Sequence, residues 1–293
     1  MTFVLPPPLA PGDLIRVIAP SGPCERTALW PGLAWIRTRY RVGMSPGVLA
    51  REGYLAGTDT RRRVELDGAL ADVEAKAIVA TRGGYGSMRV LEHCAWAHLA
   101  DRPKWIVGYS DITALHAMAW RAGIASLHAP NVTSLSRAVP ADRAGWIAGL
   151  ERPHAQRSWR GLHVLCPGQA RGVLVGGNLT LLCAMAASGC LWLPKGAILA
   201  FEDVAEAPYR IDRMLTSLVL GGYLARVAGF VVGSLERSTP GPDGGTAEEV
   251  VEQRLRPLGV PVLTGAPFGH GSRNEAFVLG ASVRLAEGAV YFS

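Results

Sequence analysis

Three residues of this chain, a serine, a glutamate and a histidine, have the types and surroundings that suit hydrolytic chemistry. Ser110 follows the apolar run 105–107 and precedes the Ala-, Leu- and Met-rich stretch 112–120, which predicts a turn between a strand and a helix. Glu202 comes at the end of another apolar run, and His270 lies between two glycines in "FGHGS". In the order Ser110, Glu202, His270 they supply a nucleophile, a group that orients a base, and the base itself.

Each of these residues also has a purely structural interpretation. Ser or Asp ahead of a helix is often an N-cap, and we expect the side chain of Asp111 to cap its own helix. The usual nucleophile elbow has Gly two residues after the serine, where this chain has Ile112. Acidic residues at strand ends are usually solvated, and an isolated histidine is more often structural than catalytic. No single motif therefore establishes an enzyme.

The glycine-rich stretch "TRGGYGS" (81–87) has three interpretations. Its N–H groups could cradle a phosphate, although it is neither a Walker loop nor Gly-x-Gly-x-x-Gly. It could be a tight turn that needs the conformational freedom of glycine. In the third interpretation, the N–H of Gly83 or Gly84 points at the same substrate oxygen as the N–H of Asp111, and the two form an oxyanion hole.

The composition predicts a soluble, globular protein. Among 293 residues, 49% are hydrophobic and 18% charged, with a net charge of +6. The basic runs 37–41 and 61–63 lack the aromatic interleaving of a nucleic-acid site, so we interpret both as solvated faces and expect no nucleic-acid partner. Five cysteines without a Cys-x-x-Cys pair, and histidines without a zinc pattern, predict free thiols, no metal and no cofactor. Because no signal peptide or 18-residue apolar run is present, we expect a cytoplasmic protein that does not bind membranes.

Several regularly placed elements would position these residues. Strand-like runs at 14–22, 75–87 and 104–111 alternate with helix-like stretches, which predicts a doubly wound parallel sheet of the flavodoxin-like or glutamine-amidotransferase-like type. In such sheets ligands bind beyond the carboxyl ends of the strands, where the turns at Ser21, 83–86 and Ser110 would meet. We expect an N-terminal α/β domain over 1–141, a connector over 142–169, and a β-rich α+β domain over 170–293.

Five stretches, read in order, resemble the signature segments of the LD-carboxypeptidase family, which also contains the microcin-immunity peptidases. They are "TRGGYGSMRVL", "VGYSDITALH", "GGNLTLLCAM", "FEDVAEAPYRIDRML" and "FGHGSRNEAFVLG". The resemblance implies a serine peptidase whose triad is Ser110, His270 and Glu202. It also implies an oxyanion hole made by the N–H groups of Asp111 and Gly84, with Gly83 as the alternative to Gly84. Since these enzymes are not α/β-hydrolases, the resemblance accounts for Ile112.

The function implied by the resemblance is removal of the C-terminal D-alanine from murein tetrapeptide during peptidoglycan recycling. Arg82 and Arg273 lie beside the motifs and could bind a substrate carboxylate, or form structural ion pairs instead. One alternative is a microcin-immunity-type peptidase that cleaves a peptidyl- or aminoacyl-nucleotide conjugate, with Trp159 or Trp192 as an aromatic platform. A second is a non-catalytic protein that binds a muropeptide or phosphate. The sequence leaves open the third residue of the peptide, the role of 133–169 and the oligomeric state, for which a homodimer is one option.

Overall fold

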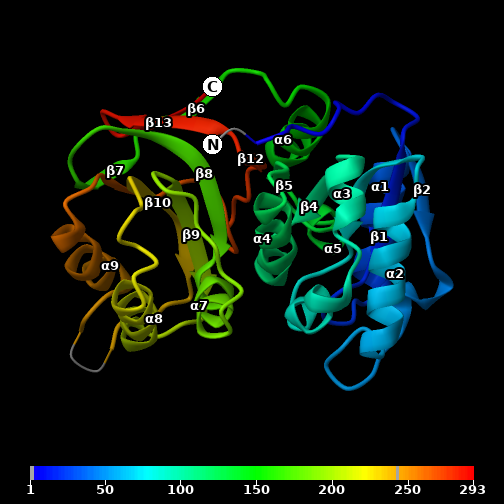
Figure 1. Cartoon of the computed structure of the whole chain (residues 1–293), viewed down its shortest axis with the longest axis horizontal. Helices are drawn as coiled ribbons and strands as arrows, with labels where there is room; N and C mark the ends of the chain where they lie inside the picture. Colours follow the sequence, from blue (N-terminus) through cyan, green and yellow to red (C-terminus); the bar gives the residue numbers. More distant parts are fainter. Residues whose placement is uncertain (1–2, 242–243) are drawn as a thin grey trace. The chain divides into compact units, whose positions relative to one another are not determined.

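The computed structural model describes residues 3–241 and 244–293, with the backbone alone for His93. The chain divides into two compact units (Figure 1). The N-terminal unit contains the residues up to Pro153 together with Glu275–Gly280, and the C-terminal unit contains His154–Asn274 together with Ala281–Ser293. No helix in the described part of the chain has both the length and the apolar character needed to cross a membrane.

The N-terminal unit is built on a six-stranded sheet with the order β12-β5-β4-β3-β1-β2. Its first five strands in the sequence pair in parallel, and β12 joins β5 as an antiparallel edge. Its strands are β1 (Leu14–Ile18), β2 (Arg41–Met44), β3 (Ala75–Ala80), β4 (Trp105–Gly108), β5 (Ser126–His128) and β12 (Phe277–Leu279). Its helices are α1 (Arg26–Arg37), η1 (Pro46–Leu49), α2 (Asp59–Ala71), η2 (Ser87–His93), α3 (Ala97–Asp101), η3 (Ser110–Ile112), α4 (Thr113–Arg121), α5 (Val132–Leu135) and α6 (Pro140–Glu151).

The predicted doubly wound parallel sheet is confirmed in this unit. Buried apolar runs form β3 and β4, as expected for strands covered on both faces. The order β2-β1-β3-β4-β5 is that of flavodoxin-like sheets. The edge strand β12 is a departure, because the sequence placed 277–279 in the C-terminal domain. It pairs here through Phe277 opposite His128.

The C-terminal unit is built on an eight-stranded sheet with the order β6-β14-β13-β8-β9-β10-β11-β7. Its four central strands, β8 to β11, pair in parallel, while the strands on both sides pair antiparallel. Its strands are β6 (Arg157–Trp159), β7 (His163–Cys166), β8 (Ala170–Asn178), β9 (Ile198–Val204), β10 (Gly229–Glu236), β11 (Val262–Thr264), β13 (Ser282–Ala286) and β14 (Ala289–Phe292). Its helices are α7 (Leu179–Ala187), α8 (Pro208–Leu220), α9 (Ala247–Leu255) and η4 (Arg256–Leu258).

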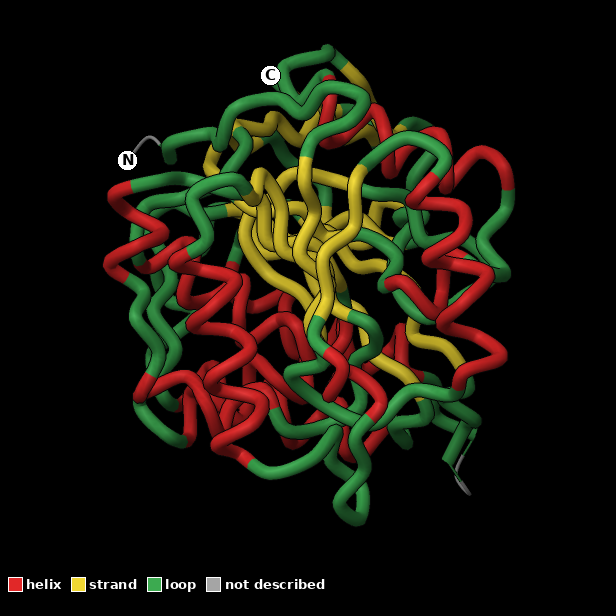
Figure 2. The backbone as a smooth tube through the Cα atoms, turned by 90° about the vertical axis from the view of Figure 1, so that its right-hand side faces the viewer, coloured by secondary structure: helices red, strands yellow, loops and turns green. Residues whose placement is uncertain are grey.

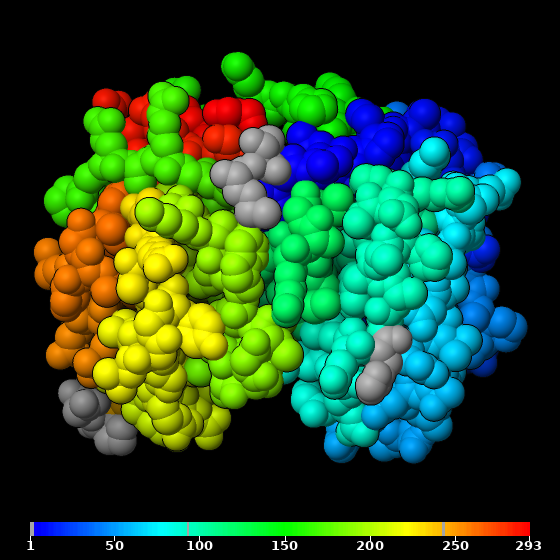
Figure 3. All heavy atoms as spheres, viewed as in Figure 1, coloured from blue at the N-terminus to red at the C-terminus, as the bar shows by residue number. Residues whose placement is uncertain are grey.

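The segment 142–169, which we expected to be a connector, contains regular structure. Most of α6 lies in it, and β6 and β7 form the two edges of the eight-stranded sheet. These strands are short, and their partners are distant in the sequence, such as Thr264 opposite His163. The local sequence pattern therefore does not indicate them. Figure 2 distinguishes the strands, helices and loops by colour, and Figure 3 shows α8 and α9 as neighbouring yellow and orange surfaces.

Candidate active site

Ser110 lies at the predicted turn between a strand and a helix. Strand β4 ends at Gly108, and Ser110 begins the short helix η3, which leads into α4. The backbone of Ser110 is left-handed, with φ of 65°. A residue other than glycine in this conformation costs on the order of 1–2 kcal/mol, and such strain is often found at functional sites. Ser110 thus has the strained backbone of a nucleophile elbow.

Buried polar groups hold the two residues that precede Ser110. The N–H of Tyr109 donates to Oδ1 of Asn131 at 3.2 Å. The carbonyl of Gly108 accepts from Nε2 of His116 at 3.0 Å, and Nδ1 of His116 lies 2.9 Å from the hydroxyl of Ser126. Burial lowers the pKa of His116 to about 4, and its contact with the Gly108 carbonyl opposes this shift. At neutral pH the His116 ring is therefore uncharged, and it supports the turn through these two contacts.

The glycine-rich turn packs against Ser110. A Cβ atom on Gly83 would lie 2.8 Å from Cβ of Ser110, 2.9 Å from its Oγ and 3.2 Å from the N atom of Asp111. The carbonyl of Gly83 accepts the N–H of Gly22 at 3.1 Å, and Gly84 has φ of 104°. Gly83 has no room for a side chain at this close approach, and Gly84 has a backbone conformation that glycine adopts readily. The tight-turn interpretation is therefore correct, and it is compatible with a role in an oxyanion hole.

Arg62 corrects the prediction that 61–63 forms a solvated face. This side chain is completely buried, and its Nη1 donates to the carbonyls of Pro20 and Gly86, each at 2.6 Å. It also pairs with Asp59. The middle residue of the run points inward from α2 and ties two turns at the carboxyl ends of β1 and β3. A run of like charges does not reveal this role, because the carbonyl partners are distant in sequence.

The side chain of Asp111 does not cap its own helix, contrary to our expectation. Instead its Oδ2 accepts the N–H of Ser87 at 2.8 Å, while the hydroxyl of Ser87 donates to the carbonyl of Asp111 at 2.6 Å. Asp111 is almost completely buried. Burial raises its pKa, and hydrogen bonds that include the Ser87 N–H oppose the shift. Asp111 thus fastens the end of the glycine-rich turn to the residue that follows Ser110.

Glu202 and His270 form a hydrogen-bonded pair in the C-terminal unit. Oε2 of Glu202 lies 2.6 Å from Nδ1 of His270. Glu202 is completely buried within β9, whereas the side chain of His270 is 18% exposed. An ionised carboxylate can only accept, so Nδ1 donates to it and the imidazole is held in the tautomer that a general base uses. The structure therefore brings together two of the three residues that the sequence assigned to the relay.

Asn178 supports Glu202 from the neighbouring strand, a role that sequence reasoning missed. It pairs with Glu202 in the β8–β9 register, and its Nδ2 lies 3.3 Å from Oε1 of Glu202 and 3.0 Å from Oδ1 of Asp203. Its Oδ1 caps α7 through the N–H of Leu181 at 3.2 Å. Asp203 also accepts the N–H and the hydroxyl of Thr180, each at 2.8 Å. Two buried carboxylates are thus held by a shared network of donors.

Two glycines and a serine position the loop that carries His270. A Cβ atom on Gly269, whose φ is 116°, would lie 2.5 Å from Oγ of Ser234 and 2.9 Å from Oε2 of Glu202. The N–H of Gly271 donates to the same Ser234 hydroxyl at 3.1 Å. The glycines therefore let the loop lie directly on β9 and β10. The motif "FGHGS" indicated free space for the histidine, but it did not identify Ser234.

The other residues named from the sequence differ in how far they are exposed. Arg82 is exposed, and its guanidinium donates to the carbonyl of Pro23 at 2.8 Å. Arg273 is exposed in the loop that follows His270. Trp159 is only 4% exposed and stacks on Phe268 at 5.7 Å, so it is a core residue and cannot serve as an open platform. Trp192 is 38% exposed.

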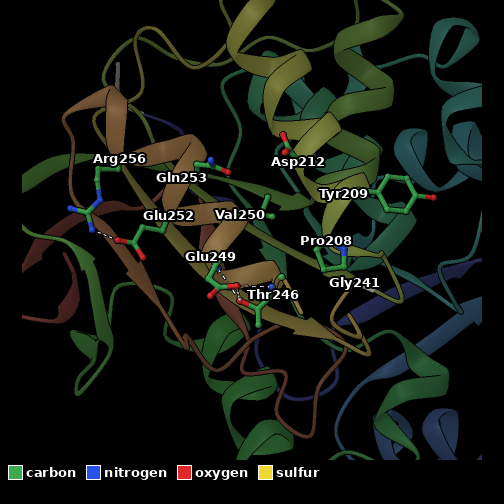
Figure 4. A pocket seen from close by; sticks show the side chains of 11 residues that line it. Pro208, Tyr209, Asp212, Gly241, Thr246, Glu249, Val250, Glu252, Gln253 and Arg256 are labelled. Atoms are coloured by element: carbon green, nitrogen blue, oxygen red, sulfur yellow. Dashed lines mark hydrogen bonds and ion pairs between the residues drawn. The ribbon is translucent and has the colours of Figure 1, made fainter. Parts of the chain in front are cut away.

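A separate pocket of about 890 Å³ lies between α8 and α9 (Figure 4). Its lining includes Tyr209 and Asp212 from α8 and Glu249 from α9, and none of the residues of the proposed relay. Asp212 is held by Arg254 at 2.6 Å. Within the described ranges, no three His, Cys, Asp or Glu side chains are grouped so that they could hold a metal ion. We assign no ligand to this pocket.

Comparisons with known proteins agree with the resemblance read from the sequence. Residues 15–129 match the model of the LD-carboxypeptidase N-terminal domain, and residues 171–285 match that of the C-terminal domain. The chain is 31% identical to the murein tetrapeptide carboxypeptidase of Pseudomonas aeruginosa, over 92% of each protein.

Solved structures give the same result. The crystal structure of muramoyltetrapeptide carboxypeptidase from Oxalobacter formigenes has a TM-score of 0.86 and 28% identity, over 96% of this chain and 98% of that one. The microcin C7 self-immunity protein MccF has a TM-score of 0.87 at 20% identity, over 99% of this chain and 98% of that one, which shows a shared fold. On the two domain models and the identity over nearly its whole length, this chain belongs to the LD-carboxypeptidase family.

Proposed function

We propose that this protein is a cytoplasmic serine LD-carboxypeptidase that releases the C-terminal D-alanine of murein tetrapeptide during peptidoglycan recycling. The observation that carries the proposal is the pair formed by Glu202 and His270 at 2.6 Å, with the carboxylate completely buried. A carboxylate in this position fixes the tautomer of the imidazole and stabilises it once it is protonated. The strained turn at Ser110 supports its assignment as the nucleophile.

The reaction begins when Oγ of Ser110 attacks the carbonyl carbon of the third residue. Nε2 of His270 takes the hydroxyl proton, and Glu202 stabilises the imidazolium through Nδ1–H. The N–H groups of Asp111 and Gly84 hold the tetrahedral oxyanion. The C–N bond then breaks, and His270 gives its proton to the amine of the departing D-alanine. A water molecule, activated by the same imidazole, hydrolyses the acyl-enzyme and restores Ser110.

The substrate assignment is supported by the relatives whose names say that they act on murein peptides. A nucleotide conjugate needs an exposed ring on which a base can stack; of the two candidate rings, Trp159 is buried and Trp192 is exposed. Arg82 and Arg273 are the basic residues nearest in sequence to the catalytic motifs, and we assign them to the free carboxylate of D-alanine. For Arg82 this leaves part of its guanidinium available, since one nitrogen is engaged with Pro23.

A comparison of three substrates tests this function. Purified protein is incubated with murein tetrapeptide, with the diastereomer that ends in L-alanine, and with a peptidyl-nucleotide conjugate, and the products are identified by mass spectrometry. We expect loss of alanine from the first peptide only. Preferential cleavage of the conjugate would establish the microcin-immunity activity instead. Saturable binding of the tetrapeptide without hydrolysis would establish a binding protein.

A further inference from the structure

Arginine side chains gather on one face of the antiparallel edge of the C-terminal sheet. Strands β8, β13, β14 and β6 follow one another there in this order (Figure 1). One row of the register crosses all four strands and consists of Arg171, Arg284, Tyr291 and Ser158. Residues that are directly opposite on neighbouring strands have their side chains on the same face. Arg160 belongs to this face too, because its Nε donates to Oγ of Ser158 at 3.1 Å.

The charges of these arginines are not offset by acidic side chains. Over the described ranges, Arg160, Arg171 and Arg284 form no ion pair. Arg171 and Arg284 are directly opposite each other, a position in which like charges repel and lower stability. An anion bound beside them removes this repulsion, so the folded protein is more stable with the anion than without it.

A pocket of about 390 Å³ adjoins this row. Its lining includes Ser158, Arg160, Arg284, Tyr291 and Ser293, and among the described residues no aspartate or glutamate lines it. The volume is within the usual range of small-molecule sites. The lining contains none of the residues of the proposed relay, so the pocket is separate from that site.

Tyr291 holds the two guanidinium groups of the pocket in place. Cζ of Arg284 lies 4.3 Å from the centroid of the ring, and Cζ of Arg160 lies 5.7 Å from it. A guanidinium that stacks on a ring keeps the N–H groups along its edge free to donate to a ligand. Because both cations are fixed before a ligand arrives, little side-chain entropy is lost on binding.

A second tyrosine provides a comparison in which one charge is neutralised. Tyr209 on α8 also has two arginines beside its ring, Arg210 at 5.8 Å and Arg213 at 5.9 Å. There Glu206 lies 3.5 Å from Arg210 and offsets its charge. The two arginines around Tyr291 have no such acidic partner, so an external anion is the group that can offset their charge.

The number of guanidinium groups indicates the charge of the ligand. A carboxylate has two oxygens and is satisfied by one arginine through two parallel hydrogen bonds. A phosphate monoester has a charge of about −1.5 to −2 at pH 7 and three acceptor oxygens, so it can bind two guanidinium groups at once. We propose that Arg160 and Arg284 bind the phosphate group of a small phosphate ester in this pocket, and that Arg171 adds to the attraction from the neighbouring strand. This inference does not depend on the proposed peptidase activity.

Isothermal titration calorimetry of the full chain with inorganic phosphate and with glycerol 3-phosphate tests the site. We expect saturable binding at one site per chain, and weaker binding as the NaCl concentration rises. Arg284→Gln and Arg160→Gln should each raise Kd by about tenfold, because each removes a charge-assisted hydrogen bond. Arg213→Gln is the matched control and should leave Kd unchanged, since it removes an exposed arginine that also lies beside a tyrosine.

The outcomes that would overturn the inference are distinct. One is the absence of binding heat in the wild type, and another is an equal Kd in the wild type, Arg284→Gln and Arg160→Gln, with the fold of each variant checked by its Tm. A loss of affinity in Arg82→Gln would place the phosphate beside the glycine-rich turn instead. Tighter binding of a single-stranded oligonucleotide than of glycerol 3-phosphate would show a nucleic-acid surface and not a small-molecule site.

Discussion

At the residue scale, the glycine-rich turn and the nucleophile leave each other almost no space. Gly83 approaches both Ser110 and the N atom of Asp111 so closely that any side chain would force one of them to move. Asp111 then ties the far end of the turn to the same place through Ser87. The position of the proposed oxyanion donors relative to the serine is therefore set by a few contacts within the N-terminal unit.

Substitution of Gly83 should affect activity through this contact. In Gly83→Ala the new methyl group would meet Ser110 at less than 3 Å, and displacement of a catalytic group by about 1 Å can cost on the order of 10²-fold in rate. We expect kcat/KM for D-alanine release to fall by about that factor. Gly68→Ala is the matched control, because this glycine is inside α2 and a Cβ atom added to it would have no neighbouring atom within 4 Å. It should keep full activity and raise the Tm by a few degrees. A fully active Gly83→Ala variant would contradict the proposal that this turn lies at the catalytic serine.

At the element scale, the crossover from β4 through α4 to β5 is held by one buried imidazole. His116 on α4 joins the last residue of β4 to Ser126 on β5. In the folded protein it must remain neutral to do so, because a protonated ring would have a buried charge and would no longer accept from the serine hydroxyl.

This arrangement predicts how stability depends on pH. The pKa of His116 is lowered from 6.5 to about 4, so between these values the unfolded chain binds a proton that the folded chain does not. The free energy of unfolding should therefore be largest above pH 6.5 and fall by up to about 3 kcal/mol as the pH drops to 4. His116→Gln, which cannot titrate, should have a shallower pH dependence in urea unfolding followed by tryptophan fluorescence. His154→Gln, at an exposed histidine, should keep the wild-type slope. Identical slopes for wild type and His116→Gln would contradict this origin.

Some of these elements could be predicted from the sequence, and others could not. The strands β1, β3 and β4 and the turns that follow them were predictable, because their apolar runs and glycines are local signals. The pairing of β12 was not, since this strand leaves the C-terminal part of the sequence to pair with β5. The short strands β6 and β7 were missed for the same reason, as their stability comes from partners about one hundred residues or more away.

At the scale of the whole molecule, the order of the motifs made Ser110, Glu202 and His270 recognisable together. Their supports were not recognisable, because each acts across a long sequence separation. Arg62 reaches the carbonyl of Gly86, and Asn178 reaches Glu202 on the next strand. The five cysteines, all of which the structure describes, are free, as their spacing predicted. A sequence pattern thus predicts the reacting groups, and the structure shows the contacts around them.

We propose that Ser110 and His270 act together in catalysis. The most direct test is a double-mutant cycle on kcat for D-alanine release, using Ser110→Ala, His270→Ala and the double variant, with the fold of each checked by circular dichroism. Residues that act as a unit are strongly non-additive. We expect each single variant to lose about 10³-fold or more, and the double variant to lose no more than either alone. Losses that multiply in the double variant would show that the two residues act independently, and would contradict the account.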